Sequence, residues 1–94
     1  LLPLAVPSGP ESAWSVSIYP NPNAGSFRVE LPEAATKGMN FCIVNLVGQE
    51  LRVLPAQAGV AMQTIQTSDL PAGLYFLQVL SEGKVLAVEK FVKQ

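Results

Sequence analysis

The 94-residue sequence contains no histidine, and this absence removes the commonest general base, the usual base of a catalytic triad and the commonest metal ligand. Its seven carboxylates are scattered among predicted turns and solvent-facing positions instead of forming pairs. No glycine-rich segment leads into a helix that could cradle a phosphate. We therefore expect no enzyme activity, no catalytic residue, and no metal or other cofactor.

Charge and cysteine are also scarce. Six basic residues oppose seven acidic ones for a net charge of −1, so no basic patch is dense enough to predict nucleic-acid binding. Cys42 is the only cysteine; it can form no intramolecular disulfide, and we expect it to be a small buried apolar residue. No apolar run approaches the roughly 20 residues of a membrane-spanning helix. With 49% hydrophobic residues, the composition favours a packed core over disorder.

What the sequence does contain is a series of short β-type segments separated by turn residues. Several alternate polar and apolar residues, as half-buried strands do, whereas the third is apolar on both sides, as a central strand would be. The predicted strands cover residues 15–19, 26–31, 40–46, 50–54, 60–66, 74–80 and 84–92. Their short spacing and the lack of a helical period predict an all-β fold, an immunoglobulin-like antiparallel β-sandwich of about seven strands.

Aromatic residues are few, and the pattern predicts where most of them lie. We expect Tyr19, Phe27, Phe41 and Tyr75 to face inward. Trp14 is expected to anchor the preceding segment on the domain, with sugar stacking as the alternative role.

Clusters of turn-forming residues separate the strands. Proline fixes φ and removes a backbone donor, an Asx side chain can bond its own backbone, and a glycine such as Gly73 is free to adopt a positive φ. The residues predicted to act as structural turn residues are Pro20, Asn21, Pro22, Gly25, Gly48, Asp69 and Pro71.

Composition divides the chain in two. Residues 1–14 have the proline- and serine-containing character of a linker from an upstream passenger domain, and residues 15–94 form the β-sandwich domain. Because the sequence starts at Leu1 without an initiator methionine, we expect it to be a segment of a longer protein.

Four motifs occur in a specific order: Tyr19-Pro20-Asn21-Pro22 with Gly25-Ser26-Phe27, then 45–49 (NLVGQ), then 70–76 (LPAGLYF), then Lys90-Phe91-Val92-Lys93. Together they resemble the C-terminal sorting domain, type A, of type IX secretion system cargo. The resemblance implies a secretion signal at the end of a large protein of a Gram-negative bacterium. It also implies recognition by an outer-membrane shuttle and translocon, followed by cleavage by a sortase-like protease in or before residues 1–13. The cargo would pass through the periplasm and end at the outer membrane, on the cell surface or as a secreted product.

The last strand is the predicted recognition element. Its apolar stretch 85–88 is flanked by lysines, so a partner could pair with its backbone while the charges discourage self-association. The predicted recognition residues are Gly73, Tyr75, Lys90, Phe91, Val92, Lys93 and Gln94.

Two alternatives remain open. Phe91 and Val92 could instead complete the core, with the lysines keeping the domain soluble. The domain could also be a carbohydrate-binding or adhesion module, for which Trp14 and Phe76 are the available aromatics. Exposed edges further predict that the isolated domain dimerises or exchanges strands.

Overall fold

The computed structural model describes residues 14–94, which form seven β-strands and no helix. The strands are β1 (Ser17–Tyr19), β2 (Ser26–Glu30), β3 (Met39–Val44), β4 (Glu50–Pro55), β5 (Met62–Gln66), β6 (Gly73–Ser81) and β7 (Lys84–Lys93). All neighbouring strands pair antiparallel. The predicted all-β sandwich is therefore confirmed.

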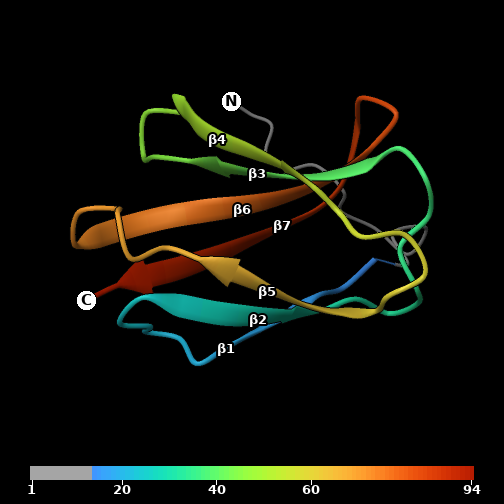
Figure 1. The fold of residues 1–94 in the computed structure, drawn as a ribbon. Helices are drawn as coiled ribbons and strands as arrows, with labels where there is room; N and C mark the ends of the chain where they lie inside the picture. Colours follow the sequence, from blue (N-terminus) through green and yellow to red (C-terminus); the bar gives the residue numbers. More distant parts are fainter. Residues whose placement is uncertain (1–13) are drawn as a thin grey trace.

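Two sheets form the layers of the sandwich (Figure 1). One has the order β1-β2-β5 and the other the order β4-β3-β6-β7. This is an immunoglobulin-like arrangement in which the fourth strand lies beside the third. As predicted from its double-sided apolar pattern, β3 is a central strand, between β4 and β6.

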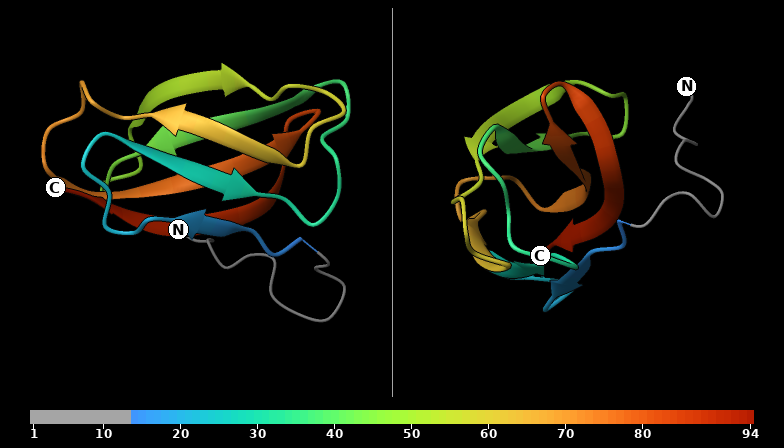
Figure 2. Two further views of the ribbon diagram at one scale, coloured as in Figure 1. Left: turned by 60° about the horizontal axis from the view of Figure 1, so that its bottom comes forward. Right: turned by 90° about the vertical axis from the view of Figure 1, so that its right-hand side faces the viewer.

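The core lies between the sheets and takes side chains from both. Phe27, Val29 and Ile65 come from the three-stranded sheet, and they pack against fully buried residues of the other sheet, among them Phe41, Ile43, Leu77, Val79 and Phe91. Along one side of the sandwich β1 lies against β7, which Figure 2 shows in both views. Trp14 is half-buried and packs against the core, so its side chain lies on the domain as expected of an anchor. The rest of the predicted linker, residues 1–13, lies outside the described residues.

Some local predictions were wrong. Tyr19 is 38% exposed, and its hydroxyl lies 3.4 Å from Oε1 of Glu30 instead of in the core. The reason is the period of the strand itself, because inward-facing Val16 and Ile18 leave Tyr19 on the opposite face with Ser17. Strand β3 ends at Val44, and Leu46 is 63% exposed in the turn that follows.

Turn chemistry explains that early ending. The Oδ1 atom of Asn45 accepts hydrogen bonds from the backbone N–H groups of Val47 and Gln49, and Gly48 follows with a φ of 83°. The N–H of Gly48 also donates to the carbonyl oxygen of Asn45, at 3.0 Å. Gly73 does not use its freedom to adopt a positive φ; it is the first residue of β6 and pairs with Lys93.

Candidate recognition site

One end of the sandwich gathers segments that are far apart in the sequence. The β1–β2 loop, the β3–β4 turn, the β5–β6 connection and the carboxyl terminus all lie at the left end in Figure 1. These are the places of the four sequence motifs. The fold therefore brings the motifs to one end of the domain, with the end of β7 among them.

The β1–β2 loop is hydrogen-bonded along the outer edge of β7. The side chain of Asn21 donates to the carbonyl oxygen of Lys90 at 3.1 Å and accepts from the N–H of Val92 at 2.9 Å. Further along, the N–H of Gln94 donates to the carbonyl oxygen of Asn23 at 2.8 Å. The loop thus replaces a neighbouring strand for residues 90–94.

Asn23 is the buried centre of this contact, with only 1% of its surface exposed. Its backbone N–H and its Nδ2 both donate to the carbonyl oxygen of Val92, at 2.9 and 3.1 Å. Its Oδ1 accepts a hydrogen bond of 2.7 Å from the hydroxyl of Thr67, which is also fully buried. A buried polar group without a partner is costly, so this closed set of bonds fixes the loop against the strand.

The inner side of the same strand end belongs to the core. The Phe91 ring lies 4.7 Å from the ring of Phe27 and 5.5 Å from that of Tyr75, measured between centroids. The hydroxyl of Tyr75 donates to the carbonyl oxygen of Pro71, which ties the β5–β6 connection to the start of β6. Tyr75 and Pro71 therefore stabilise this end of the sandwich together.

The predicted recognition residues differ in what they present to solvent. Lys90, Gln94 and Gly73 are exposed and Val92 is half-buried. Phe91 is fully buried, Tyr75 is 6% exposed and Lys93 is 8% exposed. The first group is therefore accessible at the surface of the folded domain, whereas the second group packs inside it.

The other half of the β7 edge is open in the described part of the chain. Residues 84–89 pair with β6 on one side, and no hydrogen bond joins their outer edge to any of residues 14–94. An edge of this kind can accept another strand. The asymmetry between open residues 84–89 and covered residues 90–94 could not be inferred from the sequence.

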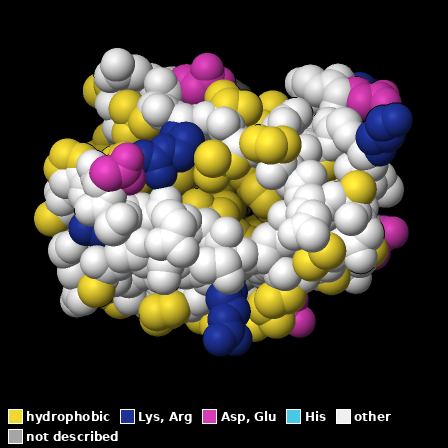
Figure 3. All heavy atoms as spheres, in the orientation of Figure 1, with side chains coloured by type: hydrophobic (Ala, Val, Ile, Leu, Met, Phe, Trp, Pro, Cys, Tyr) yellow, Lys and Arg dark blue, Asp and Glu magenta, His cyan; other side chains and the backbone are white. Residues whose placement is uncertain are grey.

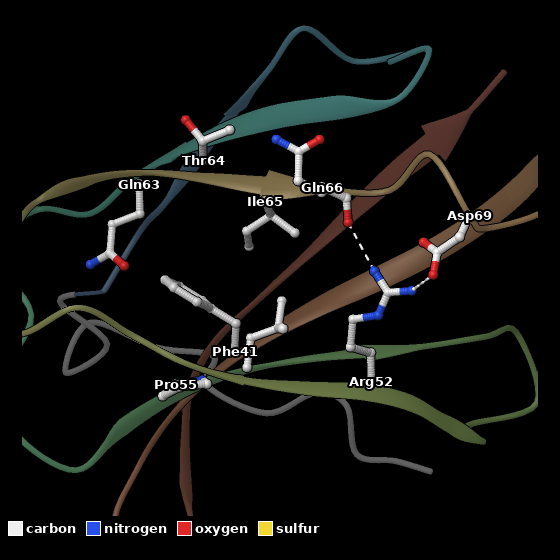
Figure 4. A pocket seen from close by; sticks show the side chains of 9 residues that line it. Phe41, Arg52, Pro55, Gln63, Thr64, Ile65, Gln66 and Asp69 are labelled. Atoms are coloured by element: carbon white, nitrogen blue, oxygen red, sulfur yellow. Dashed lines mark hydrogen bonds and ion pairs between the residues drawn. The ribbon is translucent and has the colours of Figure 1, made fainter.

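Opposite the β1–β7 side, the two sheets diverge between β4 and β5. They leave a cleft of about 480 Å³ whose lining includes Phe41, Leu54 and Ile65. Figure 3 shows hydrophobic side chains at the bottom of this hollow. Figure 4 shows that Arg52 closes one end, where it donates to the carbonyl oxygen of Gln66 at 2.9 Å and pairs with Asp69.

This ion pair affects the titration of Asp69. The hydrogen bond from Arg52 is the main reason why the pKa of Asp69 lies below its ordinary value. Both side chains face solvent, Asp69 more than Arg52. The pair joins β4 to the β5–β6 connection and so links the two sheets.

Cys42 is buried on the far side of β3 from the core, and its Sγ donates to Oε2 of Glu50 at 3.3 Å. Burial, followed by the hydrogen bond and the charge of Glu50, raises the pKa of the Cys42 thiol to about 11. The thiol is therefore protonated at neutral pH and a poor nucleophile.

Residues 14–94 contain no cluster of three or more His, Cys, Asp or Glu side chains that could hold a metal ion. None of the described residues belongs to a helix long and apolar enough to cross a membrane.

The sequence did not predict the roles of three site residues, Asn23, Thr67 and Arg52. The position of Asn23 one residue after Pro22 gives no sign that its side chain is buried against β7, because that contact spans 69 residues.

These features define the class: an immunoglobulin-like β-sandwich whose loops and last strand are bonded together at one end. The chain belongs to the secretion system C-terminal sorting domain family, whose model matches residues 17–94. It is thus a type IX secretion sorting signal, a class that interacts with the type IX secretion machinery and directs export to the cell surface or secretion. Among curated proteins and among solved structures, none matches the chain.

Proposed function

We propose that this domain carries a passenger protein across the outer membrane by presenting the end of β7 to a shuttle and translocon. The contacts are made by Lys90, Val92, Gln94 and the adjacent Gly73, while Tyr75, Phe91 and Lys93 hold these residues in position. The observation that carries the proposal is the exposure of Lys90 and Gln94 on a strand end whose edge is bonded to Asn21 and Asn23.

A strand end that is already ordered can bind a receptor at a lower entropy cost than a flexible one. Ordering a flexible tail on binding costs free energy, whereas a tail that is already ordered has lost that entropy during folding. Lys90 stands next to Phe76 across the β6–β7 pair, so the cation lies beside an apolar side chain. A receptor with an apolar surface and a carboxylate would match this pair.

The finer steps follow the same proposal. After transit through the periplasm, a sortase-like protease removes the domain by cleavage in or before residues 1–13, and the passenger remains at the cell surface or is secreted. The half-buried Trp14 supports this assignment, because a cut before it leaves its contact with the core intact.

Export of a reporter tests the proposal. Deletion of residues 90–94 is unsuitable because it removes Phe91 from the core. We would instead fuse the chain to a periplasmic reporter in a strain with type IX secretion and combine Lys90→Glu with removal of Gln94. The matched control is Lys84→Glu, an exposed lysine at the other end of β7.

We expect the double change to reduce surface display by about tenfold or more, as for a charged contact at an interface, and the control to leave display intact. Unchanged display of the folded Lys90 and Gln94 variant would refute the assignment.

Glycan binding by the isolated domain that is lost on Trp14→Ala would favour a carbohydrate-binding module instead.

A further inference from the structure

The two outer faces of the sandwich differ sharply in polarity. On the three-stranded sheet, the side chains that face away from the core are mostly polar: Ser17, Ser26, Arg28, Glu30, Thr64 and Gln66, with Tyr19 and Met62 among them. On the four-stranded sheet, the uncharged side chains at the corresponding positions are mostly apolar: Cys42, Val44, Val53, Leu74, Phe76, Leu80, Val85, Val88 and Val92, with Asn40 and Gln78 as the polar exceptions. We call this second surface the apolar face.

The alternation of the strands establishes which side these residues occupy. Phe41 and Ile43 belong to the core between the sheets, so Cys42 and Val44 point the other way. Both are buried, at 3% and 8% exposure, yet neither belongs to the core cluster. Elsewhere on the same face, Val53 is 52% and Val85 44% exposed. Apolar side chains gathered on a sheet face indicate an interaction surface.

The charged side chains of this face stand at its opposite edges. Strand pairing places Glu50 of β4 opposite Val44, Val44 opposite Phe76, and Phe76 opposite Lys90 of β7. The contact between Cys42 and Glu50 confirms that the Glu50 side chain lies on the apolar face. One row of paired residues across the sheet therefore has an acidic residue at the β4 edge, two apolar residues in the middle and a basic residue at the β7 edge.

We propose that the apolar face binds the apolar face of a second copy of this chain. If the two-fold axis lies between the faces and runs along the strands, β4 of one copy lies over β7 of the other. Glu50 of each copy then faces Lys90 of its partner, and Val44 and Phe76 pack at the centre. A two-fold axis across the strands would place Glu50 over Glu50 and Lys90 over Lys90. The row is self-complementary in the first arrangement alone.

The size of the face predicts a weak dimer. Four strands spaced about 4.8 Å apart and up to nine or ten residues long give a surface on the order of 500 Å². Stable interfaces bury about 800 Å² per partner, so this one falls in the range of transient association. Sheets stacked in this way cross at about 30° because each is twisted. The dimer would cover Lys90 and Val92, so it and the secretion machinery exclude one another.

Sedimentation velocity of the purified 94-residue chain over a range of concentrations tests the proposal. We expect a monomer–dimer equilibrium that is weakened about tenfold or more by Glu50→Lys and by Lys90→Glu, since each creates two like-charge contacts. Mixing the two variants should restore dimers, because the reversed charge at position 50 of one copy then meets the reversed charge at position 90 of the other. The double variant E50K/K90E should also dimerise.

Thr64→Glu on the polar outer face is the control and should leave association unchanged, whereas Val53→Glu should abolish it. A monomer at every concentration would overturn the proposal, and so would dimers that are indifferent to the charge at both positions, as a strand-exchanged dimer would be. Glu50 is not among the proposed recognition residues. If the dimer is not observed, the proposed function can still be tested separately by the export assay.

Discussion

The backbone N–H and the side-chain Nδ2 of Asn23 both donate to the carbonyl oxygen of Val92, and this residue pair fixes the end of the last strand. The contact joins the β1–β2 loop to residues near the carboxyl terminus. Folding the tail is therefore coupled to folding the loop, and a domain that is only partly folded would not present Lys90 and Gln94 in the same place.

Asn23→Ala should destabilise the domain by about 1–3 kcal/mol, because the buried Thr67 hydroxyl would lose its acceptor. Urea unfolding followed by tryptophan fluorescence measures the change. Gln66→Ala, at an exposed side chain of β5, is the control and should alter the free energy of unfolding by less than about 0.5 kcal/mol. Equal effects of the two substitutions would contradict the role of Asn23.

Phe91→Ala should be more severe, at about 3–5 kcal/mol, because it removes a fully buried ring from contact with Phe27 and Tyr75. Val92→Ala, at the half-buried neighbour, should cost clearly less. The same urea titrations compare them. If Phe91→Ala proved as mild as Val92→Ala, Phe91 could not be a core residue.

The Cys42 thiol should react slowly with iodoacetamide in the folded domain. With a pKa of about 11, roughly one thiol in a thousand is ionised at pH 8, and burial reduces access further. We expect alkylation about a hundredfold slower than in urea-unfolded chains.

Glu50→Gln should speed alkylation of the folded domain, because removing the neighbouring carboxylate lowers the pKa of the thiol. Mass spectrometry of timed samples at low protein concentration follows both reactions. Similar rates for folded and unfolded wild-type chains would show that Cys42 is accessible.

The Arg52–Asp69 pair should add a small, pH-dependent contribution to stability. The folded-state pKa of Asp69 lies below its ordinary value, so the contribution is present above the unfolded-state pKa of about 3.9 and is lost as the pH falls through the folded-state pKa. Asp69→Asn should lower the urea midpoint slightly at pH 7 and no longer do so once the pH is below the folded-state pKa. High salt should also reduce the difference, because the pair is exposed. A difference that grows in acid would contradict this assignment.

The sequence was sufficient for the fold because the relevant signals are local. Alternation in 26–30, the two-sided apolar pattern of 40–44 and the turn residues between strands each act over a few positions. The tight β6–β7 turn is also determined locally, because its two central residues, Glu82 and Gly83, adopt the positive φ values of a hairpin turn, 52° and 83°.

The recognition site was less accessible from sequence because its contacts are long-range. The motifs could be recognised individually, but the burial of Lys93, the bonds of Asn21 and Asn23 to β7, and the contact of Arg52 with the β5–β6 connection depend on how the two sheets stack. The error at Tyr19 has a different cause, because the local alternation of Val16 and Ile18 with Ser17 already places Tyr19 on the outward face.

The most direct test places a photoreactive amino acid at position 90, 94 or 84 of a reporter fusion and irradiates cells during type IX secretion. Positions 90 and 94 should each form an adduct with an outer-membrane component of the secretion machinery, and position 84 should not. Adducts from position 84 alone, or efficient export with no adduct from positions 90 and 94, would contradict recognition through the end of the last strand.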